Sequence, residues 1–178
     1  MMRAVAGETQ PSGIVRLGRA TMGERLGGFI YGTIVVLAVV VAGARAHPHE
    51  AGKIAVLAAV TSAVFWVAHV YSHSVGYAVS HDRHLSLATL GRIARREASL
   101  LEAAAPPVAA LLLGAAGVLS TQSAVWLAVA VGLVVLAVQG IVFARVERLG
   151  WLGTMAVVGA NVALGVVLIG LKLLVTTH

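Results

Sequence analysis

Cysteine is absent from this chain of 178 residues, and aspartate occurs only once, at Asp82. The lack of cysteine excludes disulfides, thiolate metal sites and cysteine nucleophiles. The single aspartate leaves few ways to hold Mg²⁺ against a phosphate substrate. The DxxDG, GxSxG and HExxH patterns are missing as well, so the chain lacks three of the sequence signatures by which membrane enzymes are recognised.

Charge is also scarce, because only 11% of the residues are Asp, Glu, Lys or Arg, whereas soluble domains carry about 25%. Hydrophobic residues make up 59%. A chain with so little charge cannot cover a water-facing surface, so most of its surface must face lipid. The net charge is +6. Since the basic residues flank apolar runs in short loops, we expect anionic lipid headgroups, and not nucleic acid, as their partner.

Five apolar runs are each long enough to cross a hydrocarbon core of about 30 Å as a helix. They cover residues 26–42, 54–75, 100–119, 124–144 and 152–175. The short links between them predict an all-α, up-and-down bundle. The sequence therefore predicts one transmembrane domain over residues 24–178, preceded by a flexible cytoplasmic tail over residues 1–23.

The distribution of Lys and Arg orients this bundle. Of the 13 basic residues, ten lie before the first span, in the loop after the second span and in the loop after the fourth span. The positive-inside rule places this set in the cytoplasm. The sequence thus predicts a multi-pass protein of a bacterial plasma membrane, with a cytoplasmic N-terminus and an external C-terminus.

Polar side chains gather in the cytoplasmic half of the predicted spans, namely Tyr31, His69, His73, Glu102 and Gln139. An ionisable group inside a span is costly, so each of these residues needs a partner or a function. His69 and His73 are four residues apart and share a helix face, and Glu102 begins the next span at a similar depth. Three interpretations stay open: an ion-paired contact between spans, a proton or ion path, and a divalent-metal site formed by His69, His73 and Glu102. No other cofactor is predicted.

Two prolines complicate the third span. The rings of Pro106 and Pro107 displace the carbonyls of Glu102 and Ala103, which predicts a kink where the carboxylate of Glu102 enters the membrane. Alternatively, the prolines mark the start of the helix, and Glu102 then lies at the interface.

Two loops carry further candidate residues. His47, His49 and Glu50 form an HxHE sequence in the first external loop, which is a candidate metal site. The stretch from His81 to Glu97 has amphipathic helical character and contains three arginines, Arg92, Arg95 and Arg96. We interpret it as a linker that rests on acidic lipids, with a docking site for a partner as the alternative.

Two short segments resemble a known family. The residues Arg25, Phe29 and Gly32 and the residues Phe65, Trp66 and His69 match the first-helix and second-helix motifs of the endolysosomal and prokaryotic potassium channels that carry a Phe-Ser-Asp-Gly motif. Ile30 and Tyr31 replace the Ser-Asp of that motif, and five spans replace the six-helix repeat. The resemblance implies an oligomeric pore lined by the first span. As a whole, the chain resembles small integral membrane proteins of actinobacteria.

Three functions follow as hypotheses. The first is a structural or accessory membrane subunit, as homo-oligomer or with a membrane-protein partner, and the small number of ionisable residues in the spans favours it. The second is an ion or proton transporter or channel that uses the His/Glu cluster. The third is a metal-dependent membrane hydrolase. The scarcity of catalytic motifs makes us expect that the protein is not an enzyme.

Overall fold

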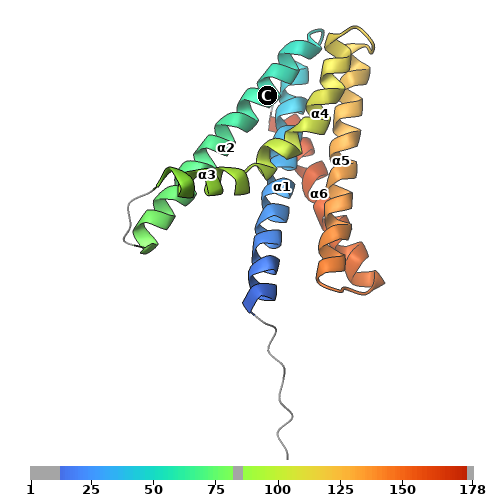
Figure 1. The fold of residues 1–178 in the computed structure, drawn as a ribbon. Coiled ribbons are helices and arrows are strands. Elements are labelled where there is room, and N and C mark those ends of the chain that lie inside the picture. Colours follow the sequence, from blue (N-terminus) through green and yellow to red (C-terminus); the bar gives the residue numbers. More distant parts are fainter. Residues whose placement is uncertain (1–12, 82–85, 176–178) are drawn as a thin grey trace, which may run out of the picture.

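The computed structural model describes residues 13–81 and 86–175, and these residues form six α-helices (Figure 1). The helices are α1 (Gly13–Ala46), α2 (Ala51–His81), α3 (Leu87–Arg96), α4 (Ser99–Ala115), α5 (Thr121–Val146) and α6 (Trp151–Val175). No strand occurs in this part of the chain. The predicted all-helical class is confirmed, with one helix more than the five predicted.

Three helices in the described residues are long and apolar enough to cross a membrane. They are Met22–Ala46 within α1, Ala51–Ser80 within α2, and α5 itself, Thr121–Val146. Helices α3 and α4 satisfy the same criterion only together, and the pair is bent by 44°. In α6 the apolar segment with described side chains, Trp151–Val167, is shorter than a membrane span. Length and composition thus give three candidate spans, or four if the bent pair is one span.

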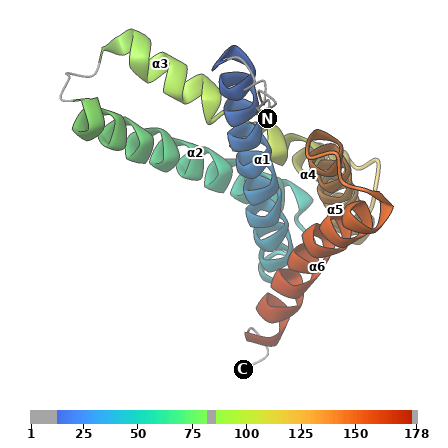
Figure 2. The same ribbon diagram turned by 90° about the horizontal axis from the view of Figure 1, so that it is seen from below.

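Successive long helices run in alternating directions (Figures 1 and 2). The loops 47–50 and 116–120 lie at one end of the bundle, which we call the upper end, and the loop 147–150 lies at the opposite, lower end. Helix α2 diverges from α1 toward the lower end, and α3 lies crosswise beside these two helices. This divergence makes room for a cavity between α1 and α2.

The apolar core occupies the upper half of the bundle. Its largest fully buried side chains include Leu37 and Val40 of α1, Ile54 of α2, Leu111 of α4 and Leu136 of α5. Because lipid is as apolar as these side chains, close packing rather than exclusion from water holds such helices together. The upper half is therefore a closely packed four-helix region.

Two glycines of α1 allow α4 to approach closely. A Cβ atom on Gly32 would lie 3.1 Å from both the Cα and the carbonyl oxygen of Leu100, and 3.0 Å from the Cβ of Ala103. A Cβ atom on Gly28 would meet the hydroxyl of Ser99. The GxxxG spacing of Gly28 and Gly32 thus brings two helix backbones together, as small residues do in membranes.

The described residues cover the two ends of the chain only in part. Helix α1 begins at Gly13, inside the segment 1–23 predicted as a flexible tail. Residues 1–12 lie outside the described residues. The predicted external C-terminus falls on residues 176–178, which also lie outside them.

Helix α4 covers Ser99–Ala115, whereas the third predicted span covers residues 100–119. Its earlier end has a local cause, because Gly117 adopts a φ of 77°, in the left-handed region that terminates helices. Pro106 and Pro107 lie inside α4. The alternative that these prolines begin the helix is therefore wrong, and Glu102 lies in the first turn.

Candidate functional site

A cavity of about 420 Å³ lies between the lower halves of α1 and α2, with α3 along its side. Three of the five predicted site residues line it: Tyr31 from α1, and His69 and His73 from α2. The other ionisable residues in its wall are Glu24, Tyr77, Arg96 and Glu97. Of these, only Arg96 was among the predicted residues, and the prediction placed it against lipid. The cavity therefore joins predicted and unpredicted polar groups from three helices.

His69 has a defined orientation. Its Nδ1 atom lies 3.0 Å from the carbonyl oxygen of Phe65, one turn earlier in α2. Since a carbonyl only accepts hydrogen bonds, Nδ1 must carry the proton. The ring of Tyr31 packs against the imidazole at a centroid distance of 5.5 Å. The Nε2 atom has no hydrogen-bond partner among the described residues, so it remains able to accept a proton or a ligand.

His73 pairs with a carboxylate from the end of α3. Its Nδ1 atom lies 2.9 Å from Oε1 of Glu97, whose side chain is only 13% exposed. Glu97 is the C-cap residue of α3, and its own backbone N–H donates to the carbonyl of Ile93. The sequence places Glu97 in a linker, and nothing in its spacing from His73 indicates this contact. The fold-back of α3 onto α2 creates it.

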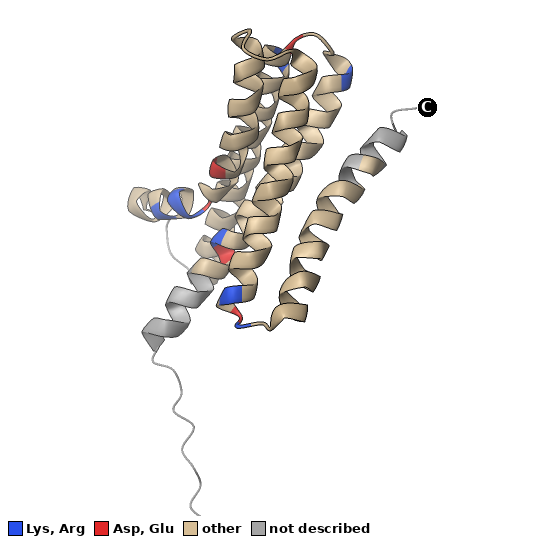
Figure 3. Cartoon of the chain, turned by 90° about the vertical axis from the view of Figure 1, so that its right-hand side faces the viewer, with Lys and Arg blue, Asp and Glu red and all other residues tan. Residues whose placement is uncertain are grey.

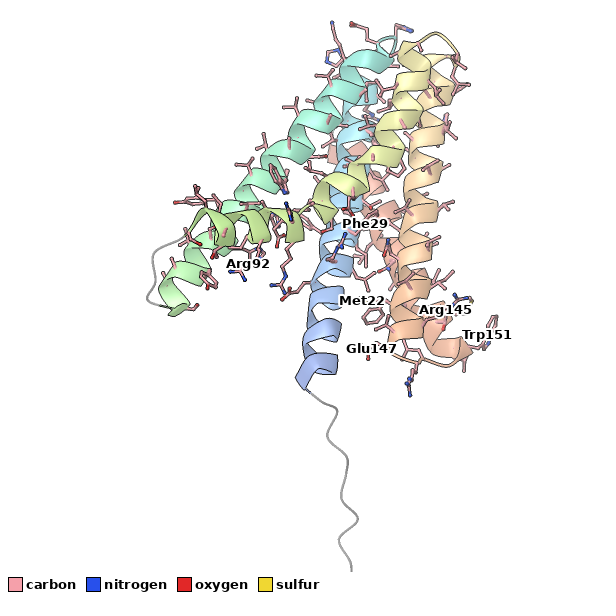
Figure 4. All side chains as sticks on the ribbon, viewed as in Figure 1. Met22, Phe29, Arg92, Arg145, Glu147 and Trp151 are labelled. Atoms are coloured by element: carbon pink, nitrogen blue, oxygen red, sulfur yellow. The ribbon has the colours of Figure 1, made fainter. Side chains whose placement is uncertain are left out.

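Two further contacts hold α3 in place. The indole Nε1 of Trp66 on α2 donates to the carbonyl oxygen of Ala94 at 3.0 Å. Arg96 forms an ion pair with Glu24 of α1. Together with the His73–Glu97 contact, these interactions attach α3 to both walls of the cavity, and Figure 4 shows α3 with Arg92 beside α2.

Glu102 does not join the histidines. Its carboxylate oxygens lie 3.2 and 3.3 Å from Nη2 of Arg25 on α1. This pair borders a separate cavity of about 260 Å³, which Gln139 of α5 and the apolar Met22 and Phe29 also line (Figure 4). The Oε1 atom of Gln139 is buried without a hydrogen-bond partner in the described part of the chain. The predicted cluster is thus divided between two cavities, with Tyr31 and the histidines in one and Glu102 and Gln139 in the other.

The division has a geometric cause. Glu102 stands in the first turn of α4, and the rotation of that helix aims its side chain at Arg25. The ion pair of Glu102 with Arg25 agrees with the ion-paired interpretation, but it joins α4 to α1 rather than to α2. In the described residues, no three His, Asp or Glu side chains gather as a metal-binding group, and this holds for His69, His73 and Glu102.

The three arginines of α3 differ in their surroundings. Arg96 turns toward the cavity and pairs with Glu24, while Arg92 donates to the hydroxyl of Thr89 at 3.2 Å. Arg95 is exposed. The helix begins where the hydroxyl of Ser86 accepts from the backbone N–H of Thr89 at 3.2 Å. Two of the three arginines predicted to face lipid, Arg92 and Arg95, therefore lie away from the cavity.

At the upper end, the HxHE loop forms a local ion pair. The carboxylate of Glu50 lies 2.6 Å from Nζ of Lys53 and 3.8 Å from Nδ1 of His47. The hydrogen bond from Lys53 lowers the pKa of Glu50 below its ordinary value, and the charges of Lys53 and His47 act in the same direction. Glu50 thus has a cationic partner in Lys53, and His49 makes no contact within the described part of the chain that would complete a metal site.

Replacement of Lys53 by methionine is expected to raise the pKa of Glu50 toward the ordinary glutamate value. A carboxylate with a lowered pKa in the folded state stabilises the fold above its unfolded pKa. That stabilisation is lost as the pH falls through the lowered value. Side-chain carbonyl shifts of ¹³C-labelled glutamate, recorded from pH 2 to 6, measure the change. An unaltered Glu50 titration in the variant would show that Lys53 does not hold the carboxylate.

The described helices and cavity define an α-helical protein with several apolar helices and a polar cavity on one side of α1. Comparisons with protein-family models, with curated proteins and with solved structures found no match for this chain. The function is therefore argued from the cavity, the core and the charges of the chain itself.

Proposed function

We propose that the protein crosses a bacterial plasma membrane five times, with its lower end in the cytoplasm. The alternating helix directions support this topology, with α4, which follows the crosswise α3, as the third span and α6, which has 25 residues, as the fifth. Basic side chains gather at the lower end and around α3 (Figure 3). The positive-inside rule assigns that end to the cytoplasm.

The position of α3 fits this topology. The Arg25–Glu102 ion pair sets the start of α4 beside Arg25. From Arg25 to Ala46, α1 rises by roughly 30 Å, which is the thickness of a hydrocarbon core. Helix α3 then lies at the cytoplasmic boundary, where Leu87, 87% exposed, reaches the lipid tails and Arg95 reaches anionic headgroups.

Within the membrane, the protein acts as a structural or accessory subunit. The observation that carries this proposal is that the cavity ends below the packed core. Beyond Tyr31 the helices leave a space of only about 10 Å³. The buried hydroxyls of Thr33 and Ser62 donate to the carbonyls of Phe29 and Ala58 in their own helices. The core cluster of the described residues consists of apolar side chains, so a permeating ion would find little there to replace its water.

The surroundings of α1 give further support. This helix contacts α2, α4, α5 and α6. Because its own chain packs around it, α1 has little surface left to line a pore between copies, as the potassium-channel resemblance would require. A membrane-protein partner or a second copy would instead contact the outer helices.

Purified protein in liposomes is expected to leave H⁺ and K⁺ leak at the level of protein-free liposomes. A fluorescent pH dye and a K⁺ electrode measure the two fluxes, with ionophores added at the end to show that the vesicles are sealed. A flux above this background that His73→Ala abolishes and Glu50→Gln preserves would overturn the proposal and support the transporter.

The transporter remains the second candidate because the Nε2 atoms of His69 and His73 lack partners in the described residues. Both imidazoles have Nδ1 fixed by an acceptor, which is the arrangement that prepares Nε2 for a proton or a metal ion. The metal-dependent hydrolase has less support, because no three His, Asp or Glu side chains in the described residues are arranged to hold a metal ion.

A further inference from the structure

At the upper end, a cavity of about 300 Å³ lies between the C-terminal end of α1 and the N-terminal end of α5. We call it the upper slot and define it by Val41, Arg45, Gln122, Val125, Trp126 and Val129. Its volume is at the lower limit of sites that hold small molecules. It is separate from the cavity that contains the histidines.

The lining of the upper slot changes from polar to apolar with depth. Arg45 and Gln122 belong to the last turn of α1 and the first turn of α5, so they lie at the mouth. Val41 lies one turn deeper on α1, and Val129 lies about two turns deeper on α5. A molecule that fills the slot must therefore have a polar head and an apolar tail.

The positive charge of Arg45 at the mouth favours a head group with a negative charge. Arg45 has no acidic partner among the described residues, and the nearby carboxylate of Glu50 is taken by Lys53 at 2.6 Å. A guanidinium group pairs with two oxygens of a phosphate in a planar, bidentate geometry. An unneutralised arginine above an apolar slot thus complements an anionic phosphate that carries a hydrocarbon chain.

We propose that the upper slot binds one anionic phospholipid, whose phosphate pairs with Arg45 and whose acyl chain packs on Val41, Val125 and Val129. The assignment rests on the proposed topology in one respect, because that topology places the mouth of the slot at the depth of lipid headgroups. It is independent of the accessory function. A flux through the protein would contradict that function and leave this site untouched.

Trp126 provides the reporter, because it lines the slot and its side chain is 65% exposed. Protein in neutral detergent micelles is titrated with phosphatidylglycerol or phosphatidylcholine brominated on the acyl chains, since bromine quenches tryptophan fluorescence. The signal of Trp126 is obtained by subtracting that of a Trp126→Phe variant. We expect half-maximal quenching at a several-fold lower mole fraction of the anionic lipid than of the zwitterionic one.

Two variants at the upper end separate the role of Arg45 from that of charge in general. Arg45→Gln is expected to make the two lipids quench equally. The double variant Glu50→Gln/Lys53→Gln removes another cation together with the carboxylate that it holds, and it is expected to keep the preference, because both residues lie outside the slot. Equal quenching of Trp126 by both lipids in the wild type would overturn the proposal. So would loss of the preference on addition of millimolar inorganic phosphate at constant ionic strength, which would make the slot a site for the free anion.

Discussion

Valine in place of Gly32 is expected to lower the free energy of unfolding by about 1–3 kcal/mol, the usual range for overpacking. The first added carbon already lies 3.1 Å from the backbone of Leu100 and 3.0 Å from the Cβ of Ala103. A backbone atom cannot move aside as the end of a flexible side chain can, so α1 and α4 must separate. Alanine should give a smaller loss in the same direction. Unfolding in detergent micelles, followed by circular dichroism, measures the difference.

Gly23 provides the control for this prediction. It lies in the same helix, and a Cβ atom built there meets nothing within 4 Å. Gly23→Val should therefore change the stability by no more than about 0.5 kcal/mol, as surface substitutions usually do. Equal losses from Gly23→Val and Gly32→Val would mean that valine destabilises α1 wherever it is placed, and that the contact between α1 and α4 does not determine the effect.

The helical class follows from the sequence, because an apolar run of about 20 residues can satisfy all its own backbone hydrogen bonds in lipid only as a helix. The extra helix α3 was visible only as an amphipathic pattern. Its axis bends from α4 at the Glu97–Ala98 link, and no proline or glycine marks that position. Pro106 and Pro107, where the sequence predicts a kink, lie inside α4 instead. The bend of 44° therefore precedes the prolines, at a position that no helix-breaking residue marks.

The sequence predicts the contacts of the candidate site best where the residues lie close together in the chain. His69 and His73 share a face because they are four residues apart on one helix, and Tyr31 lies at the same depth on α1. The partner of His73 was not predictable in this way. Depth alone made Glu102 a reasonable choice, but the rotation of α4 aims it at Arg25, 77 residues away. The rotation of a helix about its axis depends on how the helices pack, and no short pattern in a single sequence encodes that packing.

The contact between Glu97 and His73 makes the second strong prediction, that Glu97→Ala releases α3 from the wall of the cavity. Glu97 is largely buried, and His73 loses its acceptor when the carboxylate is removed. The imidazole that loses its partner is 59% exposed and can bond to water, so the loss is that of one hydrogen bond, about 1 kcal/mol. The released population of α3 should thus rise several-fold, since 1.4 kcal/mol corresponds to a factor of ten.

Spin labels can follow this motion, because the chain has no cysteine and every introduced one is unique. Labels at Leu87→Cys on α3 and Met22→Cys on α1 occupy exposed positions. Double electron–electron resonance should give a narrow distance distribution in the parent protein. In the Glu97→Ala variant a broad component should appear. Adding Trp66→Phe, which removes the hydrogen bond to Ala94, should make the broad component dominant.

Glu102→Ala tests which carboxylate holds α3, that of Glu97 or that of Glu102. Its side chain has a similar depth but pairs with Arg25 on another face of α1, so its removal should leave the α3 distances unchanged. A release of α3 by Glu102→Ala but not by Glu97→Ala would contradict the observed arrangement and restore the grouping expected from sequence. If Glu97 and not Glu102 holds α3, the position of this helix determines how widely the cavity opens at the lower end. A partner that binds the Nε2 atoms of His69 and His73 would then bind more readily to the released form.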